Sequence, residues 1–463
     1  MRSIISLLFI LASSSSVFGQ DSYATDSIPD KWIYTPEKSQ TLPATDRWWD
    51  EFGDPVLDSL ISRGIDNNFN VAIAAHRIEM ARQAIRQAKS GYYPQFSISA
   101  GWTKNRQSGN TTSISVPAEN IDYFSAGIDM AWEIDVFGRV RAKVKQSKSE
   151  YQASRADYLA VMNSLCAEIG ETYVQYRTLQ SRLQVARDNM SKQDTVLHIA
   201  RARHEAGLNS GLDVAQASTI YYSTEASIPT LQASISTTIN ALALLTGSYT
   251  DDIMPLLDNV KPIPDYKRLI PVGIPADILR RRPDVQAAEY ELAAAAAAAG
   301  VEKRNFLPTL SLSGSIGVAA HNAGDLFESR SLTYSIGPKI SWTIFDGFAR
   351  NAALASAREN MRIAAESYEL AVMTAVEEAD NAMVTYSGQY RAVISLEKVV
   401  EQSQRELDLS LDLYKQGLTD FLSVAQAQIN LLQYTDELAN AQGTASSQLI
   451  RIYKALGGGW IQN

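Results

Sequence analysis

The chain has 463 residues, of which 20% are charged, and its formal net charge is −9. This length allows a large core or several domains, whereas the acidic balance argues against a nucleic-acid partner. No internal run approaches the ~18 apolar residues of a membrane helix, which excludes a protein built mainly of membrane-spanning helices. The single cysteine, Cys166, has no intrachain partner, so we expect burial and assembly to hold the fold.

The N-terminus has the features of a secretory signal. Arg2 precedes an apolar stretch from Ile4 to Ala12, and a serine run and Val17-Phe18-Gly19 follow it. This order predicts cleavage before Gln20 and export of the mature chain, and the apolar stretch is too short for an anchor helix. No cysteine lies at the end of the signal, so we expect no lipid-attachment site there.

The sequence contains an internal repeat. The segment Val214–Ala217 recurs 210 positions later as Val424–Ala427, and Trp132 recurs as Trp342 at the same offset. Upstream of the tryptophans the offset becomes 214. A repeat of this length indicates two copies of one structural unit, neither of which is able to bury itself alone.

Each repeat predicts the same order of elements: helix, strand, strand, very long helix and long helix. The first helix spans roughly Val71 to Gly91 in one repeat and Pro283 to about Phe306 in the other. Proline is well placed at a helix start because its missing N–H would be unpaired there. The predicted organisation is a signal peptide (1–19), an N-terminal equatorial segment (20–70), repeat 1 (71–247), an equatorial linker (248–283), repeat 2 (284–457) and a C-terminal tail (458–463).

Two segments in each repeat alternate strictly between apolar and polar residues, which predicts strands with one apolar face. A soluble half-buried sheet gives the same pattern. Strands long enough for the ~9–11 residues of a tilted span, tryptophans near strand ends, and small polar sequences between paired strands favour a membrane barrel. The candidate lipid-facing residues are Ile128, Met130, Trp132, Ile336, Ile340 and Trp342.

The number of strands has a consequence for assembly. Four strands per chain cannot close a barrel, because the smallest single-chain membrane barrels have ~8 strands. Open edges are not tolerated in lipid, where each unpaired backbone group costs several kcal/mol. If these strands span a membrane, several chains must therefore pool them.

Each strand pair is followed by a very long helical segment. Arg139 to Ala206 and Ala349 to Gln416 each contain about 68 residues, or roughly 100 Å of helix. Apolar residues spaced alternately by three and four predict a coiled-coil seam along each helix, and the remaining faces are polar. Helices of this kind fit a cylinder that is wet inside and outside.

The ends of the long helices carry turn signals. Gly207 and Gly417 suit a helix C-terminus because glycine accepts the left-handed conformation. Three residues later, Ser210 and Asp420 suit the N-caps of return helices, and Ser210 with Asp213 makes a pair that resembles a capping box. Each repeat is therefore expected to fold back in a tight helical hairpin.

No catalytic constellation is recognisable. His204-Glu205 is not followed by the second histidine of a zinc helix, and Gly207 to Gly211 encloses Asn209 where a nucleophile elbow has serine. A phosphate-loop pattern is also absent. We therefore expect no enzyme activity, no cofactor and no metal site.

Several motifs resemble one known family. The first is Trp48-Trp49-x-x-Phe52-x-Asp54-Pro55. The second is the segment from Ile274-Pro275 to Glu289 with Arg282-Pro283-Asp284-Val285, which looks like a hallmark of one branch of the family. The third is the pair of strand-to-helix junctions, Trp132–Arg139 and Trp342–Gly347. By these residues the chain resembles the TolC-like outer-membrane efflux ducts of Gram-negative bacteria, in particular the NodT-type branch of RND efflux outer-membrane lipoproteins. The resemblance covers nearly the whole mature chain.

The resemblance implies a mixed α+β membrane protein that forms a homotrimer. Three chains would pool their strands into a 12-stranded barrel in outer-membrane lipid, continued by an α-helical periplasmic barrel. The implied function is a passive exit duct of a tripartite RND-type pump for small molecules such as drugs or metal ions, with a periplasmic adaptor protein and an inner-membrane transporter. A type I protein-secretion duct has the same architecture, and a soluble periplasmic coiled-coil scaffold is an alternative of another class.

The resemblance also assigns residues at the hairpin turns. Tyr414 and Asp213 match a family pair that holds the periplasmic tip closed, although Asp213 equally suits plain helix capping. The adaptor-contact candidates are Gly207, Leu208, Gly417 and Leu418.

One feature of the tip departs from the family pattern. The aspartates that ring the pore in relatives correspond here to Ser423 and Gln426. An acidic constriction at those positions is therefore not expected, and Asp420, one turn earlier, is the remaining acidic candidate.

Overall fold

The computed structural model describes residues 39–40, 47–106, 108, 120–264, 270–271 and 281–458. The expected signal peptide, part of the linker and most of the C-terminal tail lie outside these residues. The chain divides into two compact units. Unit 1 draws on residues 1–62, 166–282 and 365–463, and unit 2 on residues 63–165 and 283–364.

The main elements recur in two sets of equal length. The first helices are α2 (Phe69–Ser90) and α7 (Pro283–Arg304), of 22 residues each. The very long helices are α3 (Arg139–Glu205) and α8 (Ala349–Lys415), of 67 residues each, and the return helices are α4 (Gly211–Leu245) and α9 (Phe421–Ala455), of 35 residues each. The shorter helices α1 (Pro55–Asn67) and α5 (Thr250–Leu257) have no such counterpart among the described residues.

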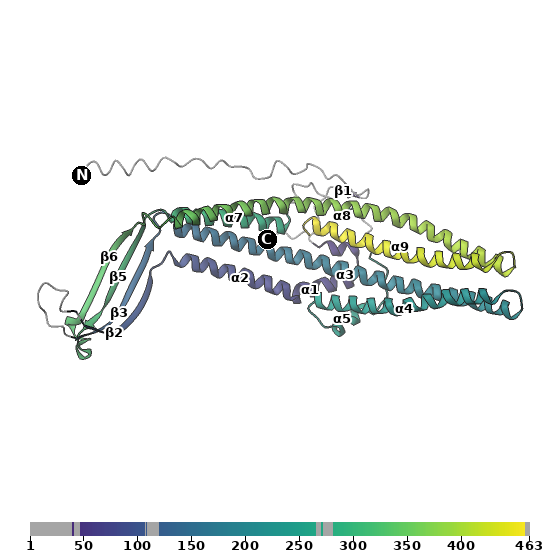
Figure 1. Ribbon diagram of the computed structural model, residues 1–463, viewed down its shortest axis with the longest axis horizontal. Helices are drawn as coiled ribbons and strands as arrows, with labels where there is room; N and C mark the ends of the chain where they lie inside the picture. Colours follow the sequence, from purple (N-terminus) through teal and green to yellow (C-terminus); the bar gives the residue numbers. More distant parts are fainter. Residues whose placement is uncertain are drawn as a thin grey trace. The chain divides into compact units, whose positions relative to one another are not determined.

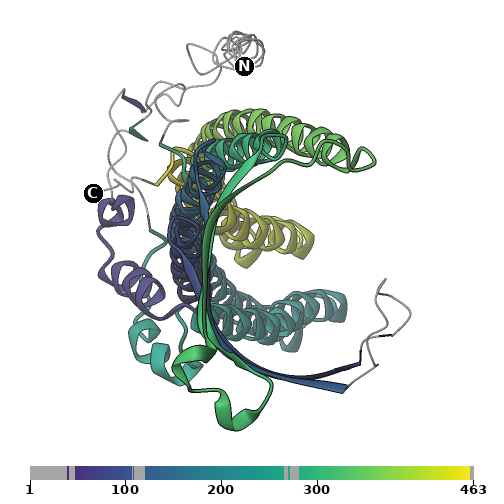
Figure 2. The same ribbon diagram turned by 90° about the vertical axis from the view of Figure 1, so that its left-hand side faces the viewer.

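Unit 2 contains one antiparallel sheet with the order β2-β3-β5-β6. Its strands are β2 (Gln95–Arg106), β3 (Asn120–Ile134), β5 (Thr309–Ala320) and β6 (Leu332–Ser341). They lie side by side in Figure 1, and Figure 2 shows that the sheet is curved. β2 and β6 are its two edges.

The register places side chains of one kind in rows across the sheet. Ile98 pairs with Ile128, Ile128 with Ile316, and Ile316 with Tyr334, which gives an apolar row over all four strands. The next row on the other face is hydroxylic and acidic, because Asp129 pairs with Ser97 and Ser315. Paired residues of an antiparallel sheet point to the same side, so the alternation of each strand adds up to one apolar and one polar face.

The centre of the sheet depends on two facing glycines. Gly127 on β3 pairs with Gly317 on β5. A Cβ atom added to Gly317 would lie 2.5 Å from the Ala126 carbonyl oxygen and 2.8 Å from the Gly127 Cα atom. The two strands approach closely because neither residue carries a side chain at this point.

The end of β6 corrects one expectation. Trp342 was expected among the lipid-facing residues of the strand, but β6 ends at Ser341. β5 begins at Thr309, the partner of Ser341, and the residue before it is Pro308, which has no N–H to donate. Trp342 therefore lies beyond the sheet, where its indole N–H donates to the Phe306 carbonyl at 3.0 Å.

Unit 1 contains two antiparallel helical hairpins. α3 runs beside α4, and α8 runs beside α9 (Figure 1). Their turns share a core of buried residues from all four helices, namely Val196, Leu197, Ala200, Ala217, Ile220, Leu407, Tyr414, Phe421, Val424, Ala425, Ala427 and Leu431. The expected seam is present along the long helices, where Ile169, Tyr173, Ala379 and Met383 are at most 1% exposed.

The helix α4 qualifies the expectation about membrane helices. It is long and apolar enough to cross a membrane by length and composition, with a window of mean hydropathy 1.2 of which 11% is buried. Scattered alanine, isoleucine and leucine residues with few charges produce this score without a continuous apolar run. In the structure α4 is the return arm of a hairpin and contributes Ala217 and Ile220 to the shared core.

The N-terminal part of unit 1 is held by buried polar contacts. Tyr173 donates to the Asp54 carboxylate at 2.5 Å, Lys261 donates to it at 3.1 Å, and the Val56 N–H donates at 3.0 Å. Burial alone would raise the pKa of Asp54, but these three hydrogen bonds together lower it. Arg177, which is fully buried, donates to the Tyr173 hydroxyl at 2.9 Å and to the Asn259 carbonyl at 2.7 Å.

Candidate functional site

The two hairpin turns have the same backbone geometry. Gly207 and Gly417 adopt φ values of 73° and 75°, which lie in the left-handed region. The N–H of Leu208 donates to the Arg203 carbonyl at 2.8 Å, and the N–H of Leu418 donates to the Leu413 carbonyl at 2.9 Å. These bonds close each long helix as a Schellman motif. The side chains of Leu208 and Leu418 are left 65% and 69% exposed.

The return helices begin at the expected caps. The Ser210 hydroxyl accepts from the Leu212 N–H at 3.2 Å, and the Asp420 carboxylate accepts from the Ser423 N–H at 3.2 Å. Ser210 also donates to one oxygen of Asp213 at 3.2 Å. The chain thus reverses within five residues because each turn combines a left-handed glycine with a capping side chain.

Tyr414 and Asp213 connect the two hairpins. The Tyr414 hydroxyl donates to the second oxygen of Asp213 at 3.1 Å. Tyr414 is 2% exposed and packs edge-on against Phe421 with ring centroids 5.5 Å apart. Asp213 lies in the first turn of α4, where the helix dipole also favours a negative charge. Both expected roles of Asp213 are therefore compatible with its position.

Two further residues contact Tyr414. The side-chain amide of Asn209 donates to the Tyr414 hydroxyl at 2.9 Å and to the Ala200 carbonyl at 3.1 Å. The Arg203 guanidinium lies 4.8 Å from the centre of the Tyr414 ring and donates to the Lys415 carbonyl at 2.9 Å. Arg203 thus holds the tyrosine by a cation–π contact and caps the end of α8.

The environment of Tyr414 keeps its hydroxyl protonated. Burial raises the pKa of the Tyr414 phenol most, the hydrogen bond from Asn209 lowers it, and the bond to Asp213 raises it again, so that the net shift is upward. A phenol with a raised pKa remains a donor at neutral pH. The contact with Asp213 is therefore a charge-assisted hydrogen bond, which is stronger than a neutral one.

The other gate candidates are placed differently. Ser423 donates to Asp420 at 3.0 Å and accepts from Thr419 at 3.2 Å, so these three residues form a local cluster at the start of α9. Gln426 donates to Asn430 at 2.9 Å along the same helix. Asp420, Ser423 and Gln426 are exposed, whereas Tyr414 is buried and Asp213 is half-buried.

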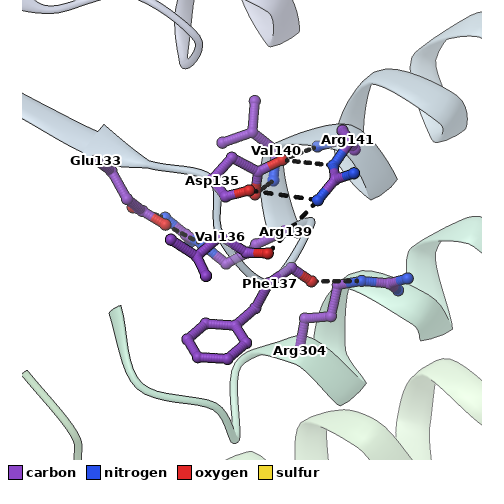
Figure 3. A network of polar contacts seen from close by, with 8 residues as sticks. All are labelled: Glu133, Asp135, Val136, Phe137, Arg139, Val140, Arg141 and Arg304. Atoms are coloured by element: carbon purple, nitrogen blue, oxygen red, sulfur yellow. Dashed lines mark hydrogen bonds and ion pairs between the residues drawn. The ribbon is translucent and has the colours of Figure 1, made fainter. Parts of the chain in front are cut away.

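β3 passes into the long helix α3 through a polar junction (Figure 3). The Asp135 carboxylate accepts from the N–H groups of Val140 and Arg141 at 2.9 and 3.0 Å and so caps α3. Arg139 pairs with Glu133, and Arg304 donates to the Phe137 carbonyl at 3.2 Å. In the second repeat Arg350 donates to Asp346 at 2.6 Å and lowers the pKa of that carboxyl.

The indole groups of the two equivalent tryptophans make the same kind of hydrogen bond near the helix end of the sheet. Trp132 donates to the Tyr92 carbonyl at 3.1 Å, as Trp342 does to Phe306. Each bond ties the strand-to-helix junction to the last turn after α2 or α7. The aromatic rings remain at the sheet end, where interfacial tryptophans are found in membrane proteins.

The apolar face of the sheet is exposed. Ile98 is 83%, Ile336 73% and Ile340 73% exposed. Ile128 and Tyr334 are 44% and 78% exposed on the same face. An apolar surface of this extent marks a contact with lipid or with another protein.

Among residues 47–106, 120–264 and 281–458 the structure gathers no three His, Cys, Asp or Glu side chains that could hold a metal ion. Cys166 is buried, and burial raises the pKa of its thiol to about 12. A thiol with so high a pKa is a packing residue rather than a nucleophile.

The sequence matches a protein family over most of its length. The profile of the outer membrane efflux protein family matches residues 60–248 and 274–458. The chain belongs to the outer membrane efflux protein family. It is therefore an outer-membrane protein that acts in efflux, and its resemblance to TolC-like channels is confirmed.

Individual relatives cover nearly the whole chain. It is 29% identical to the pyoverdine export outer membrane protein OpmQ of Pseudomonas aeruginosa, over 93% of this chain and 91% of that one. It is 28% identical to nodulation protein T of Rhizobium leguminosarum bv. viciae, over 97% and 92%. The structure of the outer-membrane channel OprN superposes with a TM-score of 0.86 and 31% identity, covering 94% of this chain and 98% of OprN.

Proposed function

We propose that three copies of this chain form the outer-membrane exit duct of a tripartite RND-type efflux pump. The observation that carries this proposal is the sheet of unit 2, whose exposed apolar face is bounded by two edge strands, β2 and β6. In lipid such a face is stable only when both edges are paired, because unpaired backbone groups cost several kcal/mol each. Pairing β2 of one chain with β6 of the next meets this need.

Closure of the sheet requires more strands than one chain has. Each chain supplies four strands, and single-chain membrane barrels begin at ~8. Three copies give twelve strands, and the curvature of the sheet (Figure 2) favours closure. The apolar rows of Ile98, Ile128 and Ile316 then face the lipid, and the polar rows line the bore.

The helices supply the periplasmic part of the duct. The hairpins of α3 with α4 and of α8 with α9 have one narrow buried seam and broad polar surfaces, which suits a wall with water on both sides. The N-terminal segment and the linker make the equatorial region. The contacts of Asp54 with Tyr173 and of the Asn259 carbonyl with Arg177 support this assignment, because they join both segments to α3.

The gate lies at the hairpin turns. Tyr414, Asp213, Asn209 and Arg203 hold the α8–α9 hairpin against the α3–α4 hairpin. A charge-assisted hydrogen bond contributes ~1.5–3 kcal/mol, enough to favour a closed state and still reversible. A partner that binds the opened arrangement better shifts the population toward it.

Leu208 and Leu418 provide the contact for that partner. Their glycine neighbours are explained by the turn geometry, but exposed leucines at both turns are not. We assign them to binding the periplasmic adaptor, which in turn connects the duct to the inner-membrane transporter. The transported compounds are small molecules such as drugs or metal ions.

Cross-linking between edge strands tests the proposal. Variants carry one cysteine on β2, at Gly101, and one on β6, at Ser335, in a Cys166→Ala background. A short bifunctional thiol reagent should give covalent dimers and trimers in membranes. The control places cysteines at Ser125 and Ala319, which pair within one chain and should give only internally linked monomers. If the Gly101 and Ser335 cysteines gave only monomers, as the Ser125 and Ala319 cysteines should, the proposal that neighbouring chains pair their edge strands would be refuted.

A further inference from the structure

The polar face of the sheet is almost free of charge. It consists of serine, threonine, glycine, alanine, glutamine and asparagine, with Tyr123 and Ile121 near the far end. Among the described strand residues, the charged side chains on this face are Asp129, Glu133 and Lys339. Glu133 and Lys339 lie in one row, with Ser311 between them, at the end of the sheet next to the helices.

Glu133 has a cationic partner, whereas no described residue forms an ion pair with Asp129. Glu133 is paired with Arg139 at the junction. Asp129 is exposed, and within the described residues its side chain has one partner, the Ser99 hydroxyl at 3.2 Å. The charge of Asp129 is therefore not neutralised by a neighbouring cation.

Asp129 also projects beyond its surroundings. Its row across the sheet contains Ser97, Ser315 and Ser335. The row on one side contains Ser99, Gly127, Gly317 and Thr333, and the row on the other contains Gln95, Ala131, Ser313 and Gly337. On the central strands β3 and β5 these neighbours are glycine, alanine and serine, so the carboxylate of Asp129 is the longest side chain in these rows apart from Gln95 on the edge strand β2.

We propose that Asp129 is a selectivity-determining residue of the duct, at which three carboxylates at one height of the barrel favour passage of cations over anions. The inference rests on the proposed function, because the ring of charge exists only where three sheets close around a bore. The rows of hydroxyls and glycine beside Asp129 add no opposing charge, and Lys339, the cation of this face among the described strand residues, shares its row with Glu133. The potential of the three carboxylates therefore extends into the water of the pore.

This position differs from the tip of the helices. Ser423 and Gln426, at the start of α9, are uncharged, so neither residue adds a carboxylate that could select ions at the tip. Asp129 lies instead in the membrane part, between rows of small residues. Selection by a wide ring depends on ionic strength, because the screening length is ~30 Å at 0.01 M salt and ~3 Å at 1 M.

Reversal potentials in planar bilayers test the proposal. The purified trimer is measured across a tenfold KCl gradient at low mean concentration, with the tip opened by Asp213→Ala and Tyr414→Phe in every variant. We expect Asp129→Asn to move the reversal potential toward zero and lower the ratio of K⁺ to Cl⁻ permeability about twofold or more at low salt. Asp129→Lys should invert the preference. At 1 M mean salt the variants should be indistinguishable.

The control is Asp122→Asn on the same strand. Asp122 lies on the opposite face, where it accepts from the Trp102 indole at 3.0 Å, so its loss should leave the reversal potential unchanged. Equal reversal potentials for wild type, Asp129→Asn and Asp129→Lys at low salt overturn the inference alone. A protein that forms no channels, in all variants and wild type, overturns the proposed function and the inference with it.

Discussion

Tyr414 and Asp213 lie 201 positions apart in different helical hairpins, and the phenol of the first donates a 3.1 Å hydrogen bond to the carboxylate of the second. The bond joins the end of α8 to the start of α4, where the two turns meet in one core. Because Tyr414 is buried and Asp213 is half-buried, the bond is shielded from water on one side. Its loss should therefore loosen one hairpin from the other.

Removal of this contact should open the tip. We expect Asp213→Ala combined with Tyr414→Phe to raise single-channel conductance in planar bilayers, since ~1.5–3 kcal/mol of the closed state is lost. The matched control is Tyr222→Phe, an exposed tyrosine on the same return helix as Asp213. Conductance that is unchanged in the double variant would show that the bond does not hold the gate.

A charge on the apolar face should prevent assembly in the membrane. Ile128→Lys and Ile336→Lys each place a cation on the lipid side, at a cost of ~2–4 kcal/mol per chain near mid-bilayer. The yield of heat-resistant trimer in outer membranes should fall strongly. Ser313→Lys, on the polar face, should assemble normally. If both isoleucine variants assembled as well as the serine variant, the faces would be assigned the wrong way round.

The glycine contact at the centre of the sheet should not tolerate a methyl group. Gly317→Ala places a Cβ atom 2.5 Å from the Ala126 carbonyl, so β3 and β5 must separate locally. Overpacking of this kind costs ~1–3 kcal/mol, and we expect a lower dissociation temperature of the trimer on gels. Gly337→Ala is the control, because an added Cβ there meets no atom within 4 Å. Equal temperatures for the two variants would contradict the close approach.

The contacts of Asp54 should make unit 1 sensitive to acid. The pKa of Asp54 is lower in the folded chain than the ordinary value of 3.8, so the ionised carboxylate stabilises the fold at pH values above 3.8. The contribution is lost as the pH falls through the folded pKa, because the protonated group no longer accepts from Tyr173 and Lys261.

Circular dichroism melts between pH 3 and 7 measure this effect. The melting temperature of wild type should fall more steeply below pH ~4 than that of Asp54→Asn, which is less stable at neutral pH but lacks this titration. Asp251→Asn, at an exposed site, serves as the control. Parallel curves for wild type and Asp54→Asn would mean that another carboxylate governs the acid response.

Local patterns predict much of this fold. The alternation around Ile128 and Ile336 predicts the face of each residue, because the period of a strand is a local property. The glycine and cap signals at Gly207, Ser210 and Asp420 predict both hairpin turns for the same reason. The end of β6 at Ser341 was missed because it depends on Pro308, which directly precedes the neighbouring strand β5.

Long-range contacts could not be derived in this way. The pairing of Gly127 with Gly317 depends on register between distant strands, and no local pattern determines it. The contacts of Arg203 and Asn209 with Tyr414 were not predicted, because the other repeat has no equivalent of either residue. The Tyr414–Asp213 pair was found only through the family resemblance, not through residue spacing.

Native mass spectrometry of the full chain in detergent tests most directly whether copies pool their strands. We predict a single species of three copies that is stable only in detergent. Removal of the detergent should cause aggregation and not the release of soluble single chains. A monodisperse single copy in detergent-free buffer would contradict it.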